Sequence, residues 1–209
     1  MCAKKRIALY GGTFDPVHVG HLEIARKVSK VFEIEKVIFI PAQIAPHKVG
    51  LPVTEPLHRY AMLALATQDD PRLVVSTFEL DEPDRRYTVD TIEHFQRELN
   101  DSTELFFIMG ADSWSEITTW REWERLLTMT NHIVVSRPGF ELTKDHVDPY
   151  GDRVFFTDVV MTEVSATNIR RLASEGRTDE LVNLLPGPVL EYIKKYGIYR
   201  ELNEAKLNS

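Results

Sequence analysis

GGTFDPVHVGH, residues 11–21, is the stretch that joins the first apolar segment of the chain to its first helical pattern. The apolar run Ile7–Tyr10 predicts a strand before it, and apolar residues at helical spacing predict a helix after it, from Val19 to Phe32. The glycine pair lets the backbone approach a ligand closely, and the start of a helix offers unpaired N–H groups and the positive end of its dipole. A strand, loop and helix of this kind favour a bound phosphate.

Two histidines, His18 and His21, stand at the start of the predicted helix, with Gly20 leaving room between them. Side chains three positions apart on a helix project from one face, and imidazoles held over a phosphate stabilise charge that develops there. The pair could instead be zinc ligands or part of a solvated helix start. The nearest additional histidine, His47, has no Cys or acidic companion in a ligand pattern. We therefore favour chemistry on a phosphate, with no metal ligand from protein side chains.

Short runs of β-forming residues alternate with helical patterns through most of the chain. The predicted strands are Ile7–Tyr10, Lys36–Ile40, Leu73–Thr77, Glu104–Met109, His132–Val135 and Val154–Thr157. The predicted helices are Val19–Phe32, Glu55–Thr67, Val89–Leu99 with Thr88 as its cap, Glu122–Met129, Ser165–Ser174, Thr178–Leu185 and Val189–Tyr196. This alternation predicts an α/β fold, a Rossmann-like doubly wound parallel sheet, over residues 1–160. Residues 161–209 are predicted to form a small C-terminal helical annex that packs on the sheet as part of one compact unit.

Composition and charge limit the classes of protein to consider. With 209 residues, 43% of them hydrophobic, the chain is long enough to bury a core in one larger domain. A formal net charge of −7 opposes general nucleic-acid binding, which needs a basic face. Cys2 is the only cysteine, so no intrachain disulfide can form, and no apolar run approaches the length of a membrane span. We expect a cytoplasmic protein without nucleic-acid or membrane partners, and the sequence leaves a homo-oligomer open.

A second candidate phosphate site lies in VSATNIRR, residues 164–171. Ser165 and Thr167 fall at the start of a predicted helix, and Arg170 follows within its next turn. Hydroxyls, free N–H groups and a guanidinium therefore converge there. The plainer alternative is an ordinary Ser cap beside a surface arginine. Two phosphate-binding ends on one sheet suit a triphosphate that spans them.

These two motifs resemble the signatures of the nucleotidyltransferase superfamily with an HxGH motif, here His18 to His21. The second signature is usually written ISSTxIR, and this chain has Val164 for Ile and Ala166 for the middle Ser. The resemblance implies ATP as substrate and transfer of its adenylyl group, with Mg²⁺ bridging phosphate oxygens. It also implies catalytic roles for His18, His21 and Arg170, pyrophosphate contacts from Ser165, Thr167 and Arg170, and further ATP contacts from Gly11, Gly12, Thr13, Phe14, Gly110 and Asp112.

Five further stretches resemble the bacterial nicotinate mononucleotide adenylyltransferases within that superfamily. They are APHK (45–48), RRYTVDT (85–91), MGADSWSEITTWREWERL (109–126), HIVVSRPG (132–139) and LLPGPVLEYIKKYGIYR (184–200). The resemblance implies transfer of the adenylyl group of ATP to nicotinate mononucleotide, giving nicotinate adenine dinucleotide and pyrophosphate in NAD biosynthesis. It also implies a pyridine ring stacked on Trp120, carboxylate contacts near Thr88 and Arg121, and other acceptor contacts from His47, Lys48 and Arg137.

Other interpretations of these residues and of the function stay open. Lys48 and Arg137 could be solvated surface residues, Asp112 a helix cap, and Trp114 and Trp123 packing residues of the core. The alternative functions are a pantetheine-phosphate adenylyltransferase, an enzyme that prefers nicotinamide mononucleotide, a nucleotide sensor without turnover, and a class I synthetase-like RNA-binding module.

Overall fold

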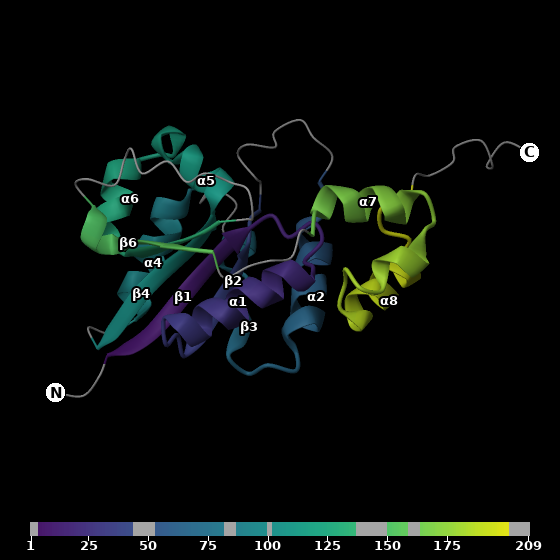
Figure 1. Ribbon diagram of the computed structural model, residues 1–209, viewed down its shortest axis with the longest axis horizontal. Coiled ribbons are helices and arrows are strands. Elements are labelled where there is room, and N and C mark those ends of the chain that lie inside the picture. The colour runs from purple at the N-terminus through teal and green to yellow at the C-terminus, as the bar shows by residue number, and fades with distance from the viewer. Residues whose placement is uncertain are drawn as a thin grey trace, which may run out of the picture.

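The computed structural model describes residues 4–43, 53–81, 87–99, 102–136, 150–158 and 164–200. Within these residues one six-stranded sheet is built from β1 (Lys5–Gly12), β2 (Lys36–Pro41), β3 (Leu73–Val75), β4 (Thr103–Gly110), β5 (Asn131–Val135) and β6 (Val154–Thr157). The strand order is β3-β2-β1-β4-β5-β6, and every neighbouring pair is parallel (Figure 1). This order confirms the predicted Rossmann-like doubly wound sheet, and all six predicted strands are present.

The direction in which strands are added to the sheet reverses between β1 and β4. The chain builds outward from β1 through β2 to β3, then crosses back to place β4 on the other side of β1. Gly11 and Gly12 end β1, and Gly110 ends β4. In open parallel sheets ligands bind at such a switch point, outside the carboxyl ends of the strands. The glycine loop therefore lies where this fold favours a ligand.

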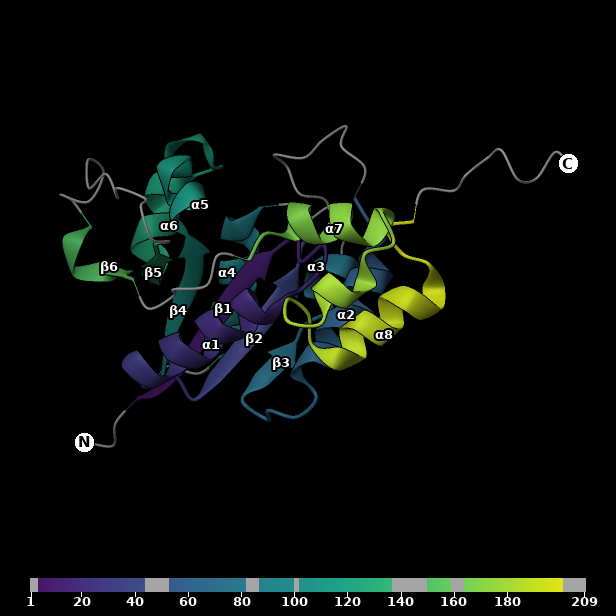
Figure 2. The ribbon, with the colours of Figure 1, turned by 45° about the vertical axis from the view of Figure 1, so that its right-hand side comes forward.

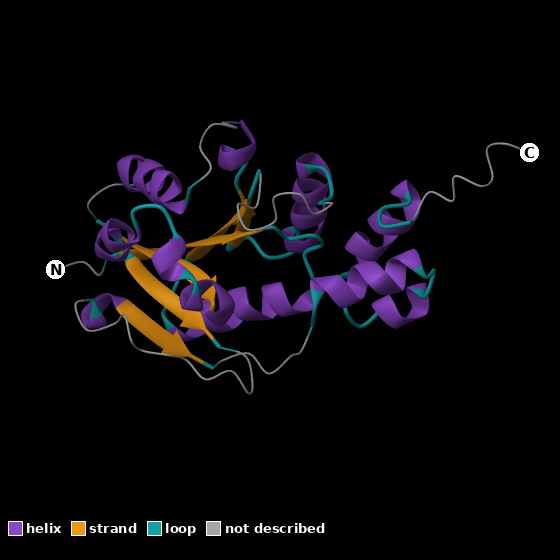
Figure 3. Ribbon diagram, turned by 90° about the horizontal axis from the view of Figure 1, so that it is seen from above, coloured by secondary structure: helices purple, strands orange, loops and turns teal. Residues whose placement is uncertain are grey.

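Helices cover both faces of the sheet (Figure 3). They are α1 (Val19–Val31), α2 (Pro56–Thr67), α3 (Phe78–Asp81), α4 (Thr88–Glu98), α5 (Ala111–Ser115), α6 (Trp123–Met129), α7 (Ala166–Ser174) and α8 (Gly187–Tyr196), with 3-10 turns η2 (Ile117–Thr119), η3 (Gly151–Arg153) and η4 (Thr178–Leu181). Side chains of β1 alternate between two hydrophobic cores, Ala8 and Tyr10 in one and Leu9 in the other. The first core includes α1, α2, α7 and α8, and the second includes α3 to α6.

The C-terminal helices share a core with the sheet. Ile169 of α7 and Val189 of α8 belong to the same buried cluster as Ala8 of β1. The backbone N–H of Val19, at the start of α1, donates to the Leu184 carbonyl oxygen at 3.1 Å. Figure 2 shows α2, α7 and α8 grouped beside α1. The division of the chain at residue 160 stays a prediction.

Six of the predicted helices are present within two residues of the predicted ends, and the seventh prediction is wrong. Only the short turn η4 forms within Thr178–Leu185. The backbone there closes three-residue turns, with Val182 N–H bonded to the Asp179 carbonyl and Leu184 N–H to the Leu181 carbonyl, and Pro186 disfavours helical backbone at the residue before it. Thr88 is the first residue of α4 and not its cap; Tyr87 occupies the N-cap position. The short elements α3, α5, η2 and η3 were not predicted, since three to five residues carry too little periodicity. No helix in the described ranges has the length and apolar character needed to cross a membrane.

Candidate active site

Two helix N-termini meet at the carboxyl end of the sheet although they are far apart in the sequence. α1 begins after His18, and α7 begins after Ser165. A Cβ atom placed on Gly20 would lie 3.7 Å from Val164 Cβ, so the two helix starts are in contact. Arg170 donates to the carbonyl oxygen of Asp15 at 2.7 Å, across 155 sequence positions. The two motifs therefore form one site that combines two positive helix ends.

The His18 and His21 rings are stacked, with centroids 3.7 Å apart and planes inclined by 26°. The backbone N–H of His18 donates to His21 Nδ1 at 3.2 Å. Because Nδ1 accepts, the proton of a neutral His21 ring sits on Nε2, which becomes a donor. A Cβ on Gly20 would lie 3.2 Å from two atoms of the His18 ring. The absence of a side chain at Gly20 thus lets the His18 ring pack over the helix start.

An aromatic ring folded beneath the glycine loop determines its shape. Phe14 has a φ of 50°, and its side chain is 3% exposed, packed against Tyr10 and Phe39 with centroid distances of 5.5 Å. A Cβ on Gly12 would lie 2.9 Å from this ring, closer than real Cβ contacts allow. Glycine is therefore required at position 12 by the ring of Phe14. The side chain of Phe14 is directed into the core, so any ATP contact at this residue falls to its backbone.

A buried arginine, which sequence reasoning missed, supports the same loop. Arg59 of α2 is 1% exposed, and burial lowers its pKa. Its guanidinium donates to the carbonyl oxygens of Thr13 (2.7 Å), Ala42 (2.7 Å), Thr54 (2.9 Å) and Gln43 (3.4 Å). These bonds hold the ends of β1 and β2 and the entry to α2 together. The available signal was a charged residue one turn before Met62 on the apolar face of a predicted helix.

The last described turn of the chain also reaches the loop, through a contact that no local pattern indicates. Tyr199 Oη donates to Asp15 Oδ1 at 2.7 Å across 184 positions, and the Thr54 N–H donates to Asp15 Oδ2 at 3.2 Å. Burial and the Asp15 charge raise the pKa of Tyr199, so this phenol stays protonated. Asp15 is thus bound twice by the C-terminal helical region, at its carboxylate by Tyr199 and at its carbonyl by Arg170.

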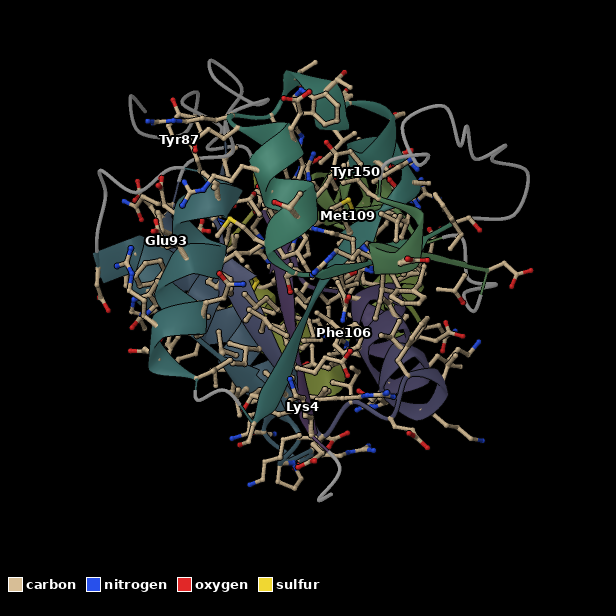
Figure 4. The ribbon with its side chains drawn as sticks, turned by 90° about the vertical axis from the view of Figure 1, so that its left-hand side faces the viewer. Lys4, Tyr87, Glu93, Phe106, Met109 and Tyr150 are labelled. Carbon is tan, nitrogen blue, oxygen red and sulfur yellow. The ribbon has the colours of Figure 1, made fainter. Side chains whose placement is uncertain are left out.

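A cavity of about 220 Å³ opens on the α4 face of the sheet, beside the glycine loop. Its lining residues are Gly11, Gly12, Thr13, Ile40, Ala42, Glu79, Tyr87, Thr88, Thr91, Phe107, Met109, Gly110, Ser113, Thr119, Trp120 and Arg121. Figure 4 shows Tyr87 and Met109 toward the end of the sheet opposite Lys4, which precedes β1. The cavity therefore lies at the carboxyl ends of the strands. Residues 11–13 line it together with side chains of the second core, whereas α1 and α7 pack in the first core.

Three of the predicted acceptor residues, Thr88, Trp120 and Arg121, come together in this cavity. Trp120 is partly buried and meets Phe107 edge to face, with centroids 6.4 Å apart. The Arg121 guanidinium lies 4.7 Å from the centroid of the Tyr87 ring at the rim. The N–H of Thr88, in the first turn of α4, has no partner within its own helix. The cavity thus combines an aromatic face with a helix N-terminus.

The other predicted site residues differ in whether they lie at the helix starts, outside the cavity or outside the described residues. Ser165 is the N-cap residue of α7 but makes no capping hydrogen bond with its side chain, and Thr167 accepts a hydrogen bond from Arg170 at 3.2 Å. Asp112 is exposed on α5 and does not line the cavity, unlike Gly110. His47, Lys48 and Arg137, predicted to bind the acceptor, lie outside the described residues.

Comparisons with known proteins agree on the family of this chain. The model of the cytidylyltransferase-like family matches residues 9–172. A probable nicotinate-nucleotide adenylyltransferase of Thermoanaerobacter sp. is 41% identical over 207 residues, which cover 95% of this chain and 96% of the relative. The probable nicotinate-nucleotide adenylyltransferase of Thermus thermophilus is 42% identical over 195 residues, 93% of this chain and 100% of the relative.

A solved structure shares the fold. The nicotinic acid mononucleotide adenylyltransferase of Plasmodium falciparum, complexed with NaAD, superposes with a TM-score of 0.77 at 20% identity, covering 93% of this chain and 97% of that one. The family model and the two full-length relatives carry the assignment, and the structural likeness supports the fold. The chain belongs to the cytidylyltransferase-like family and, within it, to the nicotinate-nucleotide adenylyltransferases.

Proposed function

We propose that this protein transfers the adenylyl group of ATP to nicotinate mononucleotide, forming nicotinate adenine dinucleotide and pyrophosphate in NAD biosynthesis. One observation carries the proposal: residues 11–13 line an aromatic cavity and lead into the start of α1, which contacts the start of α7. A triphosphate suits the helix ends, and a pyridine mononucleotide suits the cavity. The acceptor phosphate can then meet the α-phosphate of ATP at the glycine loop.

The reaction at the loop is an in-line displacement. An oxygen of the acceptor phosphate attacks the α-phosphorus, and the bond from that phosphorus to the bridging oxygen of the β-phosphate breaks. Because His21 Nδ1 accepts from the His18 N–H, the proton of the neutral ring is on Nε2, and we assign this N–H as the donor to an α-phosphate oxygen. A preorganised donor of this kind stabilises charge that grows in the transition state. The acceptor phosphate is already ionised, so the step requires no protein base.

The start of α7 suits the leaving pyrophosphate. Arg170 is anchored by its bonds to the Asp15 carbonyl and to Thr167, so its remaining N–H groups are oriented for phosphate oxygens. The uncapped first turn of the helix adds backbone N–H groups beside Ser165. These groups are all hydrogen-bond donors or hydroxyls, which fit phosphate oxygens rather than a bare cation. Mg²⁺ would arrive bound to the triphosphate and neutralise its charge.

The cavity favours nicotinate over nicotinamide. The Thr88 N–H and the positive end of α4 suit a carboxylate. A carboxamide brings no negative charge to this helix end, and its NH₂ group would face a donor when turned toward it. An unpaired polar contact of this kind costs about 1–3 kcal/mol, which is roughly tenfold to a hundredfold in kcat/KM. The Trp120 ring can stack on the pyridinium ring of either acceptor, so it contributes affinity for both and does not discriminate between them.

The test is to incubate the protein with ATP, Mg²⁺ and one acceptor at a time and to measure pyrophosphate. Nicotinate mononucleotide should give a kcat/KM at least about tenfold above nicotinamide mononucleotide, and phosphopantetheine should give none. If the two acceptors are mixed at equal concentration and the two dinucleotides form in equal yield, the proposed preference for nicotinate is wrong, although the protein still transfers the adenylyl group. Absence of turnover with every acceptor would favour a nucleotide sensor. A cytoplasmic location belongs to the same proposal, and size-exclusion chromatography would decide whether the enzyme is a homo-oligomer.

A further inference from the structure

One carboxyl group lines the cavity that the proposed function assigns to the acceptor. Glu79, on α3, is the acidic residue among the described lining residues. The Thr91 hydroxyl donates to Glu79 Oε1 at 2.8 Å, and Thr91 itself is 1% exposed. No described residue bonds to Oε2, and we assign this oxygen to a ligand. The carboxyl group is therefore held in a defined position at the cavity wall.

Glu79 lies close to the place where a nicotinate carboxylate is expected. Thr88 and Thr91 both line the cavity and are three residues apart on α4, so they share a helix face at a separation of about 4.5 Å along the axis. A carboxylate held by the first turn of α4 is then a close neighbour of the carboxyl group that Thr91 binds. Two carboxylates in one site repel each other unless a proton lies between them.

We propose that Glu79 is a specificity-determining residue, whose carboxyl group shares a proton with the carboxylate of the nicotinate acceptor. This inference rests on the proposed function. The proton is on Glu79 before binding or is taken up from solvent during binding, and apart from this proton transfer no bond is made or broken. A carboxamide can meet either form of Glu79, because its oxygen accepts from the protonated carboxyl group and its NH₂ group donates to the carboxylate. Binding of nicotinamide mononucleotide therefore does not depend on this proton.

The surroundings of Glu79 favour the protonated form. Burial raises the pKa of Glu79 to about 7, while the Thr91 hydrogen bond and the Arg59 charge act in the opposite direction. The guanidinium of Arg59 is committed to four backbone carbonyls and makes no ion pair with Glu79 among the described contacts. Among the described residues, other titratable or charged groups on the elements around Glu79 include Asp81 on α3, His94 stacked on the Phe78 ring, and Tyr87 and Arg121 at the rim.

The experiment compares the wild-type enzyme with Glu79→Gln, which keeps the shape of the side chain and removes its titration. For the wild type, kcat/KM for nicotinate mononucleotide should fall about tenfold from pH 7.5 to 8.5, because the required proton becomes scarce. The same fall should be absent in Glu79→Gln and absent for nicotinamide mononucleotide with either enzyme. The acceptor phosphate titrates near pH 6, below this window, so it does not produce the fall.

A second measurement reads the proton directly. Calorimetric titration of the acceptor at pH 8, in buffers of different ionisation enthalpy, should show uptake of most of one proton with nicotinate mononucleotide. Glu79→Gln should show none. Glu98→Gln, an exposed position at the far end of α4, is the matched control and should behave as the wild type.

Thr91→Val gives a separate check if Glu79→Gln folds poorly. It removes the hydrogen bond that lowers the pKa of Glu79, so the pH at which kcat/KM falls should move upward. An identical pH profile in the wild type and Glu79→Gln, or equal proton uptake with both acceptors, would overturn the inference. Failure of the proposed function would look different, since neither acceptor would then yield pyrophosphate at any pH.

Discussion

His21 has two ring nitrogens with different tasks, and two substitutions separate them. Nδ1 accepts a hydrogen bond from the His18 N–H at 3.2 Å at the start of α1, and Nε2, which carries the proton of the neutral ring, is the proposed donor to the α-phosphate. The amide oxygen of Asn can take the place of Nδ1 but offers no donor at Nε2. The amide nitrogen of Gln can take the place of Nε2 but offers no acceptor at Nδ1. His21→Asn should therefore keep the helix start, and His21→Gln should keep the catalytic donor.

The two losses have different sizes and appear in different measurements. Removing a preorganised donor to developing charge costs about 10²–10³ in kcat, or roughly 3–4 kcal/mol. Losing the acceptor at the helix start costs about 1 kcal/mol of folding free energy. We expect His21→Asn to lose about a hundredfold or more in kcat with an unchanged unfolding midpoint. We expect His21→Gln to stay within about tenfold of the wild-type kcat and to unfold at lower urea concentration.

Pyrophosphate release at saturating substrates gives kcat, and urea unfolding gives stability. Both variants lose the stacking of His21 on His18, so this loss cancels in the comparison between them. His21→Ala lacks both nitrogens and should show both defects. If His21→Asn retains more activity than His21→Gln, the assignment of donor and acceptor to the two nitrogens is refuted.

Four further predictions follow from the site and the core. Arg170→Ala should raise the KM for ATP about tenfold or more and leave the KM for the acceptor within about threefold, since a charge-assisted bond to phosphate is lost. A rise confined to the KM of the acceptor would show that Arg170 does not bind the ATP phosphates. Trp120→Ala should raise the KM of both mononucleotides by a similar factor, and an effect on one alone would show that the ring contributes to choice. Tyr199→Phe removes a buried donor to Asp15 and should lower the unfolding free energy by about 1–3 kcal/mol in urea titrations, so an unchanged midpoint would contradict the contact. Burial lowers the pKa of His132 to about 4 from 6.5, so the unfolded chain binds this proton first. Stability should fall by up to about 3 kcal/mol as pH drops from 6.5 to 4, and melts of His132→Phe should lack that fall.

Local patterns were enough to predict the sheet and most of its helices. Apolar runs of strand length, helical spacing and the glycine pair act over a few residues, and each predicted strand formed where they occur. The histidine motif is local in the same sense, because His18 and His21 meet within one helical turn. The Thr178–Leu185 prediction was wrong, since the segment forms only the turn η4, and its Leu184 carbonyl accepts from the distant Val19 N–H, a contact that no pattern within the segment indicates.

The supporting contacts of the site depend on packing between distant elements. Tyr199 meets Asp15 across 184 positions, and Arg59 binds carbonyls from three separate loops. Glu79 reaches the cavity from a four-residue helix that carries no periodic signal. The type and spacing of residues indicate what a side chain can bind. How deeply that side chain is buried, and which group it contacts, depend on how the helices pack on the sheet. The residue types therefore indicated phosphate chemistry, and only the folded chain determined which carbonyls, carboxylates and helix ends hold them in place.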